Sequence, residues 1–232
     1  MSWETHFYND KWFNDISNLD AKKKVAKKIA ALVKNDDIIG FGSGSTSYLA
    51  AIEIAKKIKE ESLSIHAIPT SHEVELVCAA LNIPITTLFA NKPDWCFDGA
   101  DEVDKNLNLI KGRGGALYNE KLVMANSSHR YILIDKSKLV EHLGTNYPVP
   151  IEISPKAVNY VKQKIIELGA KSFNVRMAGS GKDGPIITEN GNLIIDAHFK
   201  SIDGNLEKEI KKIIGVIESG IFWGYNVELM II

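Results

Sequence analysis

Apolar residues recur along the first two thirds of the chain in two alternating patterns. Val25, Ile29 and Val33 follow a helical spacing, with Asp20 at the expected N-cap. The run "DIIGFG" is typical of a short buried strand, and "STSYLAAIEIAKKIKEE" is typical of a helix after it. A helix is also expected at 70–82, where Thr70 and Glu73 have the spacing of a capping box. Further strands are expected at 64–69, 85–89, 94–102 and 131–135, and a further helix at 116–126.

This alternation of strand and helix continues to about residue 143. It predicts an α/β fold with a Rossmann-like, mostly parallel sheet and helices on both faces. Ligands of such sheets bind beyond the carboxyl ends of the strands. Polar or glycine-rich stretches that directly follow an apolar strand are therefore the first candidates for a functional site.

The pattern changes at "TNYPVPIEISP", where three prolines fall close together. A strand at 149–153, a helix at 155–168 and a strand at 172–177 follow, and "TENGN" is a hairpin signal between two short apolar runs. After a helix at 206–214 the chain closes with strands. We expect residues 146–215 to form a smaller ferredoxin-like α+β domain. Residues 1–145 and 216–232 would form the Rossmann-like domain, with "NVELMII" rejoining its sheet.

Composition and charge narrow the class of protein. The chain has 232 residues, of which 45% are hydrophobic and 25% charged, and its formal net charge is −1. There is no broad basic field for a nucleic acid, and we interpret the basic run Lys22–Lys28 as a solvated helix face. No stretch approaches the ~18 apolar residues of a membrane span. The start "MSWETHFYND" lacks the pattern of a signal peptide, and Cys78 and Cys96 have no CxxC spacing. A soluble cytoplasmic protein is expected.

The glycine-rich stretch "GFGSGST" at 40–46 joins the first strand of the expected sheet to its helix. It is not a Walker A loop, and Ser47 stands where the dinucleotide fingerprint needs its third glycine. The next strand ends in "AIPT", without the acidic residue that would bind a ribose hydroxyl, so NAD is disfavoured. Backbone N–H groups at the helix start, with the hydroxyls of Ser43, Ser45 and Thr46, suit a phosphate monoester. The alternative is a tight turn with a Ser or Thr N-cap.

The acidic stretch "FDGADEVD" places Asp98, Asp101, Glu102 and Asp104 within seven residues. Crowded carboxylates beside an apolar wall repel one another, so at least one is expected to have a raised pKa, which suits proton transfer. Two alternatives remain at this stage. The carboxylates would also suit a divalent metal, or the stretch would be a solvated acidic turn.

Two later stretches also carry candidate chemistry. In "KGRGGALYNEK", the glycines at 112, 114 and 115 let the backbone approach a ligand, and Lys111 suits a developing oxyanion. Glu120, in the helix that follows, would reach over a substrate as a base; the alternative is a surface Glu–Lys pair. In "IDKSKLVEHLG", Lys138 is either a ligand for an anionic group or a surface lysine. No histidine has metal-ligand spacing, and no GxSxG elbow occurs.

In this order, the four stretches resemble the ribose-5-phosphate isomerase A family. "GFGSGST" resembles its GxGTGST loop, "DGADEVD" its DGADE motif and "KGRGGALYNEK" its KGGGGAxxxEK segment. "DKSKLVEHLG", "YPVPIEISP", "TENGNLIID" and "IGVIESGIF" have counterparts too, so that the resemblance runs from about Ala21 to the C-terminus. Residues 1–18 lie outside it. The family isomerises ribose 5-phosphate to ribulose 5-phosphate in the pentose phosphate pathway. The resemblance implies a homodimer or homotetramer and no organic cofactor or metal.

The resemblance also assigns roles to individual residues. Glu120 matches the catalytic glutamate of the family; its residue type suits a base that moves a proton between C2 and C1. Asp98 would help to open the furanose and shuttle hydroxyl protons, and Lys111 would stabilise the negative oxygen. Lys22 matches more loosely a lysine that helps to hold phosphate. The implied substrate-binding residues are Ser43, Gly44, Ser45, Thr46, Asp98, Gly99, Ala100, Asp101, Lys111, Gly112, Arg113, Gly114 and Lys138.

Two positions depart from the family pattern. Ser43 replaces a threonine but keeps the hydroxyl, and Arg113 replaces a glycine. We expect the Arg113 side chain to point outward, because the glycines around it remain. The alternatives are another sugar-phosphate protein, such as an amino-sugar phosphate deaminase or a coenzyme A transferase, and a non-catalytic sugar-phosphate sensor. A transferase would form a covalent glutamyl thioester, and a sensor would need a DNA-binding partner domain.

Overall fold

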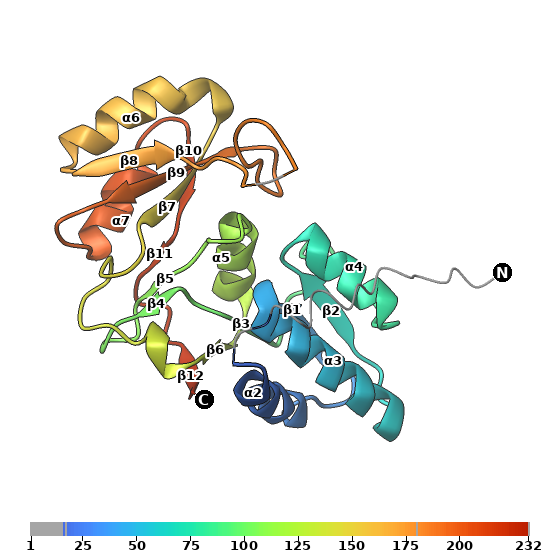
Figure 1. Cartoon of the computed structure of the whole chain (residues 1–232). Coiled ribbons are helices and arrows are strands. Elements are labelled where there is room, and N and C mark those ends of the chain that lie inside the picture. The colour runs from blue at the N-terminus through green and yellow to red at the C-terminus, as the bar shows by residue number, and fades with distance from the viewer. Residues whose placement is uncertain (1–15, 17, 180, 232) are drawn as a thin grey trace. The chain divides into compact units, whose positions relative to one another are not determined.

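A computed structural model describes residues 16, 18–179 and 181–231 of the chain (Figure 1). The expectation about a signal peptide concerns residues that lie outside this part. The described residues divide into two compact units. The first contains those up to Gly99, the segment Leu122–Lys136 and those from Val227 onward; the second contains Ala100–Lys121 and Ser137–Asn226.

The first unit is built on a five-stranded parallel sheet in the order β12-β6-β3-β1-β2. The expected parallel sheet is thus confirmed, and the last strand does rejoin it, next to β6. The strands are short, and β1 and β3 at the centre are almost entirely buried. The bounds are β1 Ile38–Phe41, β2 His66–Pro69, β3 Trp95–Asp98, β6 His129–Ile134 and β12 Glu228–Ile231.

Helices cover both faces of this sheet, as predicted. Ile39 and Phe41 of β1 lie in one apolar core with the buried residues of α2, α3 and α4. Gly40, between them, faces the other way because side chains alternate along a strand. A Cβ atom at Gly40 would lie 2.3 Å from Cγ1 of Val123, so α5 covers this second face. The bounds are α2 Leu19–Ala31, α3 Gly44–Glu61, α4 His72–Ala80 and α5 Leu117–Asn126.

The second unit contains a ferredoxin-like arrangement, which also agrees with the sequence. Its elements run β7, α6, β8, β9, α7, β10, and its antiparallel sheet has the order β10-β7-β9-β8. Ile151 and Ile195 of the sheet pack in one core with Ile165 of α6 and Ile210 of α7, so both helices lie on one face. The bounds are β7 Val149–Ile153, α6 Val158–Glu167, β8 Ser172–Val175, β9 Leu193–His198, α7 Gly204–Lys211 and β10 Val216–Ser219.

A three-stranded sheet, β11-β5-β4, completes the second unit and leads into the candidate site residues. Its strands contain two residues each and are fully buried. Two short 3₁₀ helices flank β7 in sequence. The bounds are β4 Glu102–Val103, β5 Leu109–Ile110, β11 Ile221–Phe222, η1 Lys136–Lys138 and η2 Pro155–Ala157.

Several local expectations need correction. The N-cap of α2 is Asn18, not Asp20, which lies in the first turn. The N-cap of α4 is Ser71, whose hydroxyl accepts from the Val74 N–H, because the Thr70 hydroxyl donates to the Phe41 carbonyl and so joins β2 to β1. The expected strand at 85–89 is only a single bridge from Ile85 to Ala67.

The domain boundaries expected at 145/146 and 215/216 stay a prediction. β10 begins at Val216 and pairs with β7 in the second unit, whereas β12 pairs with β6 in the first. Around the expected hairpin, β9 forms after a turn in which the Thr188 N–H donates to the Asn192 carbonyl.

Candidate active site

The glycine loop of the first unit runs from the end of β1 into α3. Ser43 is the N-cap in extended conformation, and its side chain does not cap the helix. The first turn of α3 contains no acidic residue. No carboxylate of that turn therefore neutralises the N–H groups and the positive end of the helix dipole. Gly44 and Ser45 are exposed, and Ser43 and Thr46 are half-buried. This arrangement can bind an anion.

Lys22 brings a positive charge to the same loop. Lys22 lies in α2 and is buried, and its Nζ donates to the Ser45 hydroxyl at 3.1 Å. The remaining lysines of the 22–28 run are exposed. The solvated-face interpretation therefore holds for those lysines but is wrong for Lys22.

Asp98, at the end of β3, lies beside this loop. Its side chain is buried, and its Oδ1 accepts from the Gly99 N–H at 2.7 Å. A Cβ atom at residue 42 would lie 2.2 Å from Cγ of Asp98, so the carboxylate occupies the space that Gly42 leaves. The Gly42 N–H in turn donates to the Phe97 carbonyl at 2.8 Å, which joins the loop to β3. The first unit thus brings together a cation, hydroxyls, helix N–H groups and a carboxylate.

The acidic stretch divides into structural and candidate carboxylates. Glu102 is fully buried and accepts from the N–H groups of Gly144, Asn146 and Tyr147. Asp104 accepts from the Asn106 and Asn108 N–H groups and closes a turn. Both carboxylates are thus engaged in holding loops. Neither matches the expected alternative of a solvated acidic turn.

Asp101 is the candidate carboxylate in the second unit. Its Oδ2 accepts from the Arg113 N–H at 3.2 Å. Burial raises the pKa of Asp101 above its usual range, and Glu120 adds to the rise; the Lys111 ammonium, the Arg113 N–H and Lys138 oppose it. A raised pKa suits a group that exchanges protons with hydroxyls near neutral pH.

Lys111 and Glu120 form a buried ion pair in the second unit. The Lys111 Nζ lies 3.2 Å from Oε2 of Glu120, and each side chain is only 4% exposed. Lys111 directly follows β5, and Glu120 lies in the first half of α5. The turn between them needs Gly112, whose φ is +109° and whose Cβ would lie 2.9 Å from Cβ of Leu117. The alternative of a surface pair between Glu120 and the adjacent Lys121 is wrong, because both residues are buried.

The other predicted residues also have defined positions. Arg113 is exposed, as expected, and so is Gly114, while Gly99 and Ala100 are half-buried. Lys138 ends η1 as a half-buried residue, with its Nζ 3.4 Å from the Tyr147 hydroxyl and 5.1 Å from the centre of that ring. It is therefore more than an isolated surface lysine. The residues up to Gly99 belong to the first unit, and those from Ala100 to Glu120, with Lys138, belong to the second.

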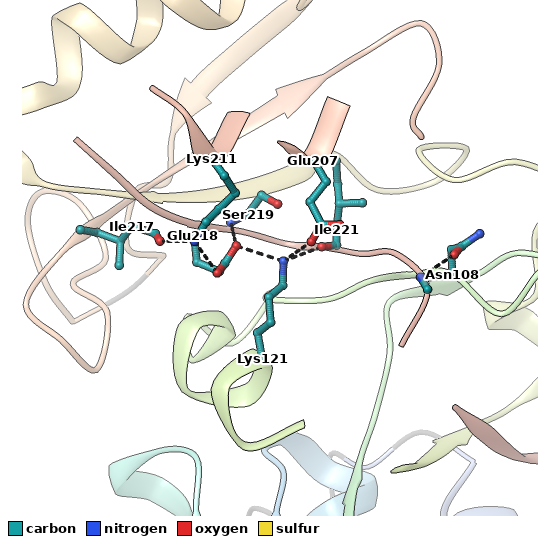
Figure 2. A network of polar contacts seen from close by, with 9 residues as sticks. Asn108, Lys121, Glu207, Lys211, Ile217, Glu218, Ser219 and Ile221 are labelled. Atoms are coloured by element: carbon teal, nitrogen blue, oxygen red, sulfur yellow. Dashed lines mark hydrogen bonds and ion pairs between the residues drawn. The ribbon is translucent and has the colours of Figure 1, made fainter. Parts of the chain in front are cut away.

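The sequence gives little sign of two polar clusters around these residues. Lys121, next to Glu120, is buried and donates to Glu207, Glu218 and the Ile221 carbonyl (Figure 2). This network holds the first half of α5 to α7, β10 and β11. The second cluster is Arg176 with Asp196, which contacts the glycine segment after Lys111. Asp196 in the apolar run "LIIDAH" is the one signal that points to it.

Within residues 16, 18–179 and 181–231, no three His, Cys, Asp or Glu side chains are grouped so as to hold a metal ion. In the same part of the chain, no helix combines the length and apolarity that crossing a membrane requires.

A parallel α/β sheet with a glycine loop at a helix start, and a buried lysine–glutamate pair after a short strand, define an α/β enzyme. A family model for ribose 5-phosphate isomerase A (phosphoriboisomerase A) matches residues 66–232. Ribose-5-phosphate isomerase A of Methanocaldococcus jannaschii is 45% identical over 89% of this chain and 92% of its own. That of Methanothermobacter thermautotrophicus is 40% identical over 89% and 91%. The chain therefore belongs to the ribose 5-phosphate isomerase A family.

Solved structures agree with this assignment. The isomerase of Methanocaldococcus jannaschii matches with a TM-score of 0.87 at 43% identity, over 93% of this chain and 95% of that one. A D-ribose-5-phosphate isomerase in complex with phospho-erythronic acid matches with a TM-score of 0.88 at 39% identity, over the same shares of both chains. The similarity thus spans both compact units.

Proposed function

We propose that this chain interconverts D-ribose 5-phosphate and D-ribulose 5-phosphate through an enediolate, as a step of the non-oxidative pentose phosphate pathway. The observation that carries the proposal is the buried pair of Lys111 and Glu120, 3.2 Å apart. Aldose–ketose isomerisation needs a base for a carbon-bound proton and a cation or N–H donor for the oxygen that becomes negative. This pair supplies both groups in an environment from which water is largely excluded.

In the proposed reaction, Glu120 removes the proton from C2 of the open-chain aldose. The electron pair moves into a C1–C2 double bond, and the carbonyl oxygen at C1 becomes negative. Lys111 stabilises that oxygen. Glu120 then returns the proton to C1, while the hydroxyl proton on O2 passes to O1, so that no atom is gained or lost. Acid–base help of this kind contributes about 10²–10⁴-fold.

The carboxylates of the DGAD turn would accept and donate the protons of the sugar hydroxyls. Asp98 would open the furanose and move protons between sugar oxygens. Asp101, whose pKa is raised by burial, is suited to the same exchange. Gly99 and Ala100 would contact sugar oxygens through their backbone, and Gly112, Arg113, Gly114 and Lys138 would contribute further substrate contacts.

The glycine loop of the first unit would hold the phosphate. Ser43, Gly44, Ser45 and Thr46 supply hydroxyl and N–H donors, and Lys22 adds a positive charge through its contact with Ser45. A relative at 39% identity has been solved with phospho-erythronic acid, which carries a phosphate and a carboxylate. Binding of the phosphate would supply the energy that positions the sugar at the reacting groups.

The proposal includes the oligomeric state, the cellular location and the cofactor requirement of the chain. The family resemblance supports a homodimer or homotetramer that works in the cytoplasm without an organic cofactor or resident metal. Purified chain would be run on a calibrated gel-filtration column with light scattering. A monomer at micromolar concentration would contradict the oligomer.

The direct test is conversion of ribose 5-phosphate to ribulose 5-phosphate by the purified chain, assayed with a chelator present. We expect turnover; its absence would contradict the proposed function. In Lys111→Gln, we expect kcat/KM to fall by about 10²-fold or more, because an oxyanion partner is lost. Lys212 pairs with Glu209 at 2.6 Å on the surface of α7 and provides the control. Because its side chain is largely exposed, Lys212→Gln should change kcat/KM by less than about twofold.

A further inference from the structure

Arginine is used sparingly in this chain, which makes its positions informative. Of 28 basic residues, only Arg113, Arg130 and Arg176 are arginines. An arginine differs from a lysine in its planar fork of donors, which binds carboxylates and pairs of oxygens in fixed geometry. Arg176 follows β8, and all three nitrogens of its fork donate hydrogen bonds.

The Arg176 guanidinium joins a carboxylate to two backbone carbonyls. Its Nε donates to Oδ2 of Asp196 at 2.8 Å, and its Nη2 pairs with Oδ1 of the same residue. Its Nη1 donates to the carbonyls of Gly112 at 2.8 Å and Arg113 at 2.7 Å. The side chains are 13% and 21% exposed, so water screens the pair less than it screens a surface ion pair.

The two carbonyls belong to the glycine segment 112–115, which directly follows Lys111. Gly112 has a φ of +109° and Gly115 a φ of +90°, and glycines lose much conformational freedom when they are ordered. Inside the segment, the Gly115 N–H donates to the Gly112 carbonyl at 3.2 Å. A loop of this composition needs an external partner to keep one conformation.

Fixing the carbonyls also fixes the N–H groups of the same peptide units. In a trans peptide the C=O and N–H bonds point in opposite directions. The carbonyl of Gly112 points to Arg176, and the N–H of Arg113, from the same peptide, donates to Asp101 on the other side. The next carbonyl, of Arg113, also points to Arg176, which directs the Gly114 N–H away from the guanidinium.

We propose that Arg176 and Asp196 are positioning residues that order the glycine segment, and that they thereby hold the Arg113 N–H on Asp101 and aim Lys111 and the Gly114 N–H. We name the two residues the Arg176–Asp196 clamp. This role rests on the proposed function, in which Lys111 and the Gly114 N–H bind the negative oxygen and the hydroxyls of the sugar. The clamp itself touches no reacting atom.

Hydrogen exchange tests whether the clamp orders the glycine segment, and it does not depend on enzyme activity. The amides of residues 112–115 would be followed by mass spectrometry in wild type, Arg176→Met and Asp196→Asn. Because charge-assisted hydrogen bonds to two carbonyls are lost, we expect these amides to exchange about ten- to a hundredfold faster. Arg130→Met is the matched control, because the Arg130 Nε also donates to a backbone carbonyl, that of Met124 at 2.7 Å, away from the segment. Exchange in 112–115 that matches this control would overturn the proposal.

Kinetics and chemical rescue test whether the clamp positions Lys111 and the N–H donors of the glycine segment. We expect Arg176→Met to lower kcat by about tenfold or more while KM changes by less than about threefold, because transition-state donors are displaced. Arg176→Lys should recover only part of the loss, since one ammonium cannot reproduce the fork. In Arg176→Ala, millimolar guanidinium should restore kcat, and an equal concentration of sodium chloride should not.

The outcomes separate the two proposals. If wild type converts ribose 5-phosphate and Arg176→Met keeps a normal kcat, the positioning role is overturned even if the segment exchanges faster. Loss of kcat without rescue by guanidinium, accompanied by unfolding of the variant, would also overturn it. If wild type shows no conversion, the proposed function fails, and the exchange experiment alone decides whether the clamp orders the segment.

Discussion

A Cβ atom added to Gly42 would lie 2.2 Å from Cγ of Asp98 and 2.3 Å from its Oδ1. No real Cβ contact is that short, so the glycine loop can adopt its course only because Asp98 fills the space beside a residue without a side chain. Asp98 has little freedom to yield: it is buried and its Oδ1 is bound to the Gly99 N–H. The candidate phosphate loop and the candidate proton shuttle therefore depend on each other.

Gly42→Ala should consequently displace the Asp98 carboxylate. We expect a loss of about 1–3 kcal/mol in the free energy of unfolding, as for other overpacked sites. We also expect kcat/KM to fall by about 10²-fold, since small misplacements of reacting groups are costly. Gly179→Ala serves as the control, because a Cβ there would meet nothing within 4 Å. Urea denaturation and steady-state kinetics measure both effects; equal behaviour of the two variants would contradict the dependence.

The Glu218 carboxyl makes the stability of the fold depend on pH. Burial by itself would raise its pKa, but the Lys121 ammonium, the hydrogen bonds from Lys211 and Lys121 and the Ser219 N–H outweigh burial, so the pKa lies below its usual range. The unfolded chain titrates near the ordinary glutamate value of about 4.3. The stability that Glu218 contributes is therefore fully present above that pH and is lost as the pH falls toward the lower folded pKa.

Comparison with Glu218→Gln isolates this contribution. Urea denaturation of wild type and the variant would be measured from neutral pH down to about pH 3, across the range in which glutamate titrates. We expect the difference in the free energy of unfolding to be largest near neutral pH and to shrink on acidification. A difference that stays constant or grows would contradict the lowered pKa.

Both cysteines should be unreactive in the folded chain. Burial, with a smaller effect of Glu75, raises the pKa of Cys78 to about 12, and both Cys78 and Cys96 are buried free thiols. The thiolate is the reactive form, so labelling at neutral pH must await unfolding. We expect Ellman's reagent to label neither thiol of the native protein within minutes and both in urea. Rapid labelling of the native protein would contradict their burial.

Much of the first unit could be predicted because its signals are local. An apolar run, a glycine turn and an amphipathic helix follow one another in the chain around Gly42, so strand, loop and helix were expected at their observed places. In the second unit, Lys111 and Glu120 were each expected as site residues, but their ion pair was not predicted, although only nine positions and one glycine turn separate them. The ferredoxin-like order of elements follows in the same way from the alternation of patterns after Tyr147.

The parts that escaped prediction depend on contacts between distant residues. Arg176 lies 64 positions from Gly112, and no periodicity reveals that its fork meets that carbonyl. Similarly, Lys22 is buried and contacts Ser45 in a different helix, whereas the sequence shows only a run of lysines. Glu102 looked like a member of an acidic cluster, yet it binds three backbone N–H groups from residues 144–147.

The central claim is that Glu120 transfers the carbon-bound proton. The most direct measurement is the incorporation of deuterium from D₂O into the sugar phosphates, followed by NMR, in wild type, Glu120→Gln and the control Glu209→Gln. Glu209 forms only an exposed i,i+3 pair with Lys212, so its variant should behave as wild type does. We predict that wild type exchanges the C2 proton of ribose 5-phosphate and a C1 proton of ribulose 5-phosphate. We predict that Glu120→Gln still binds substrate but loses exchange by about 10²-fold or more, since a base is removed. Exchange at the wild-type rate in Glu120→Gln would contradict the claim.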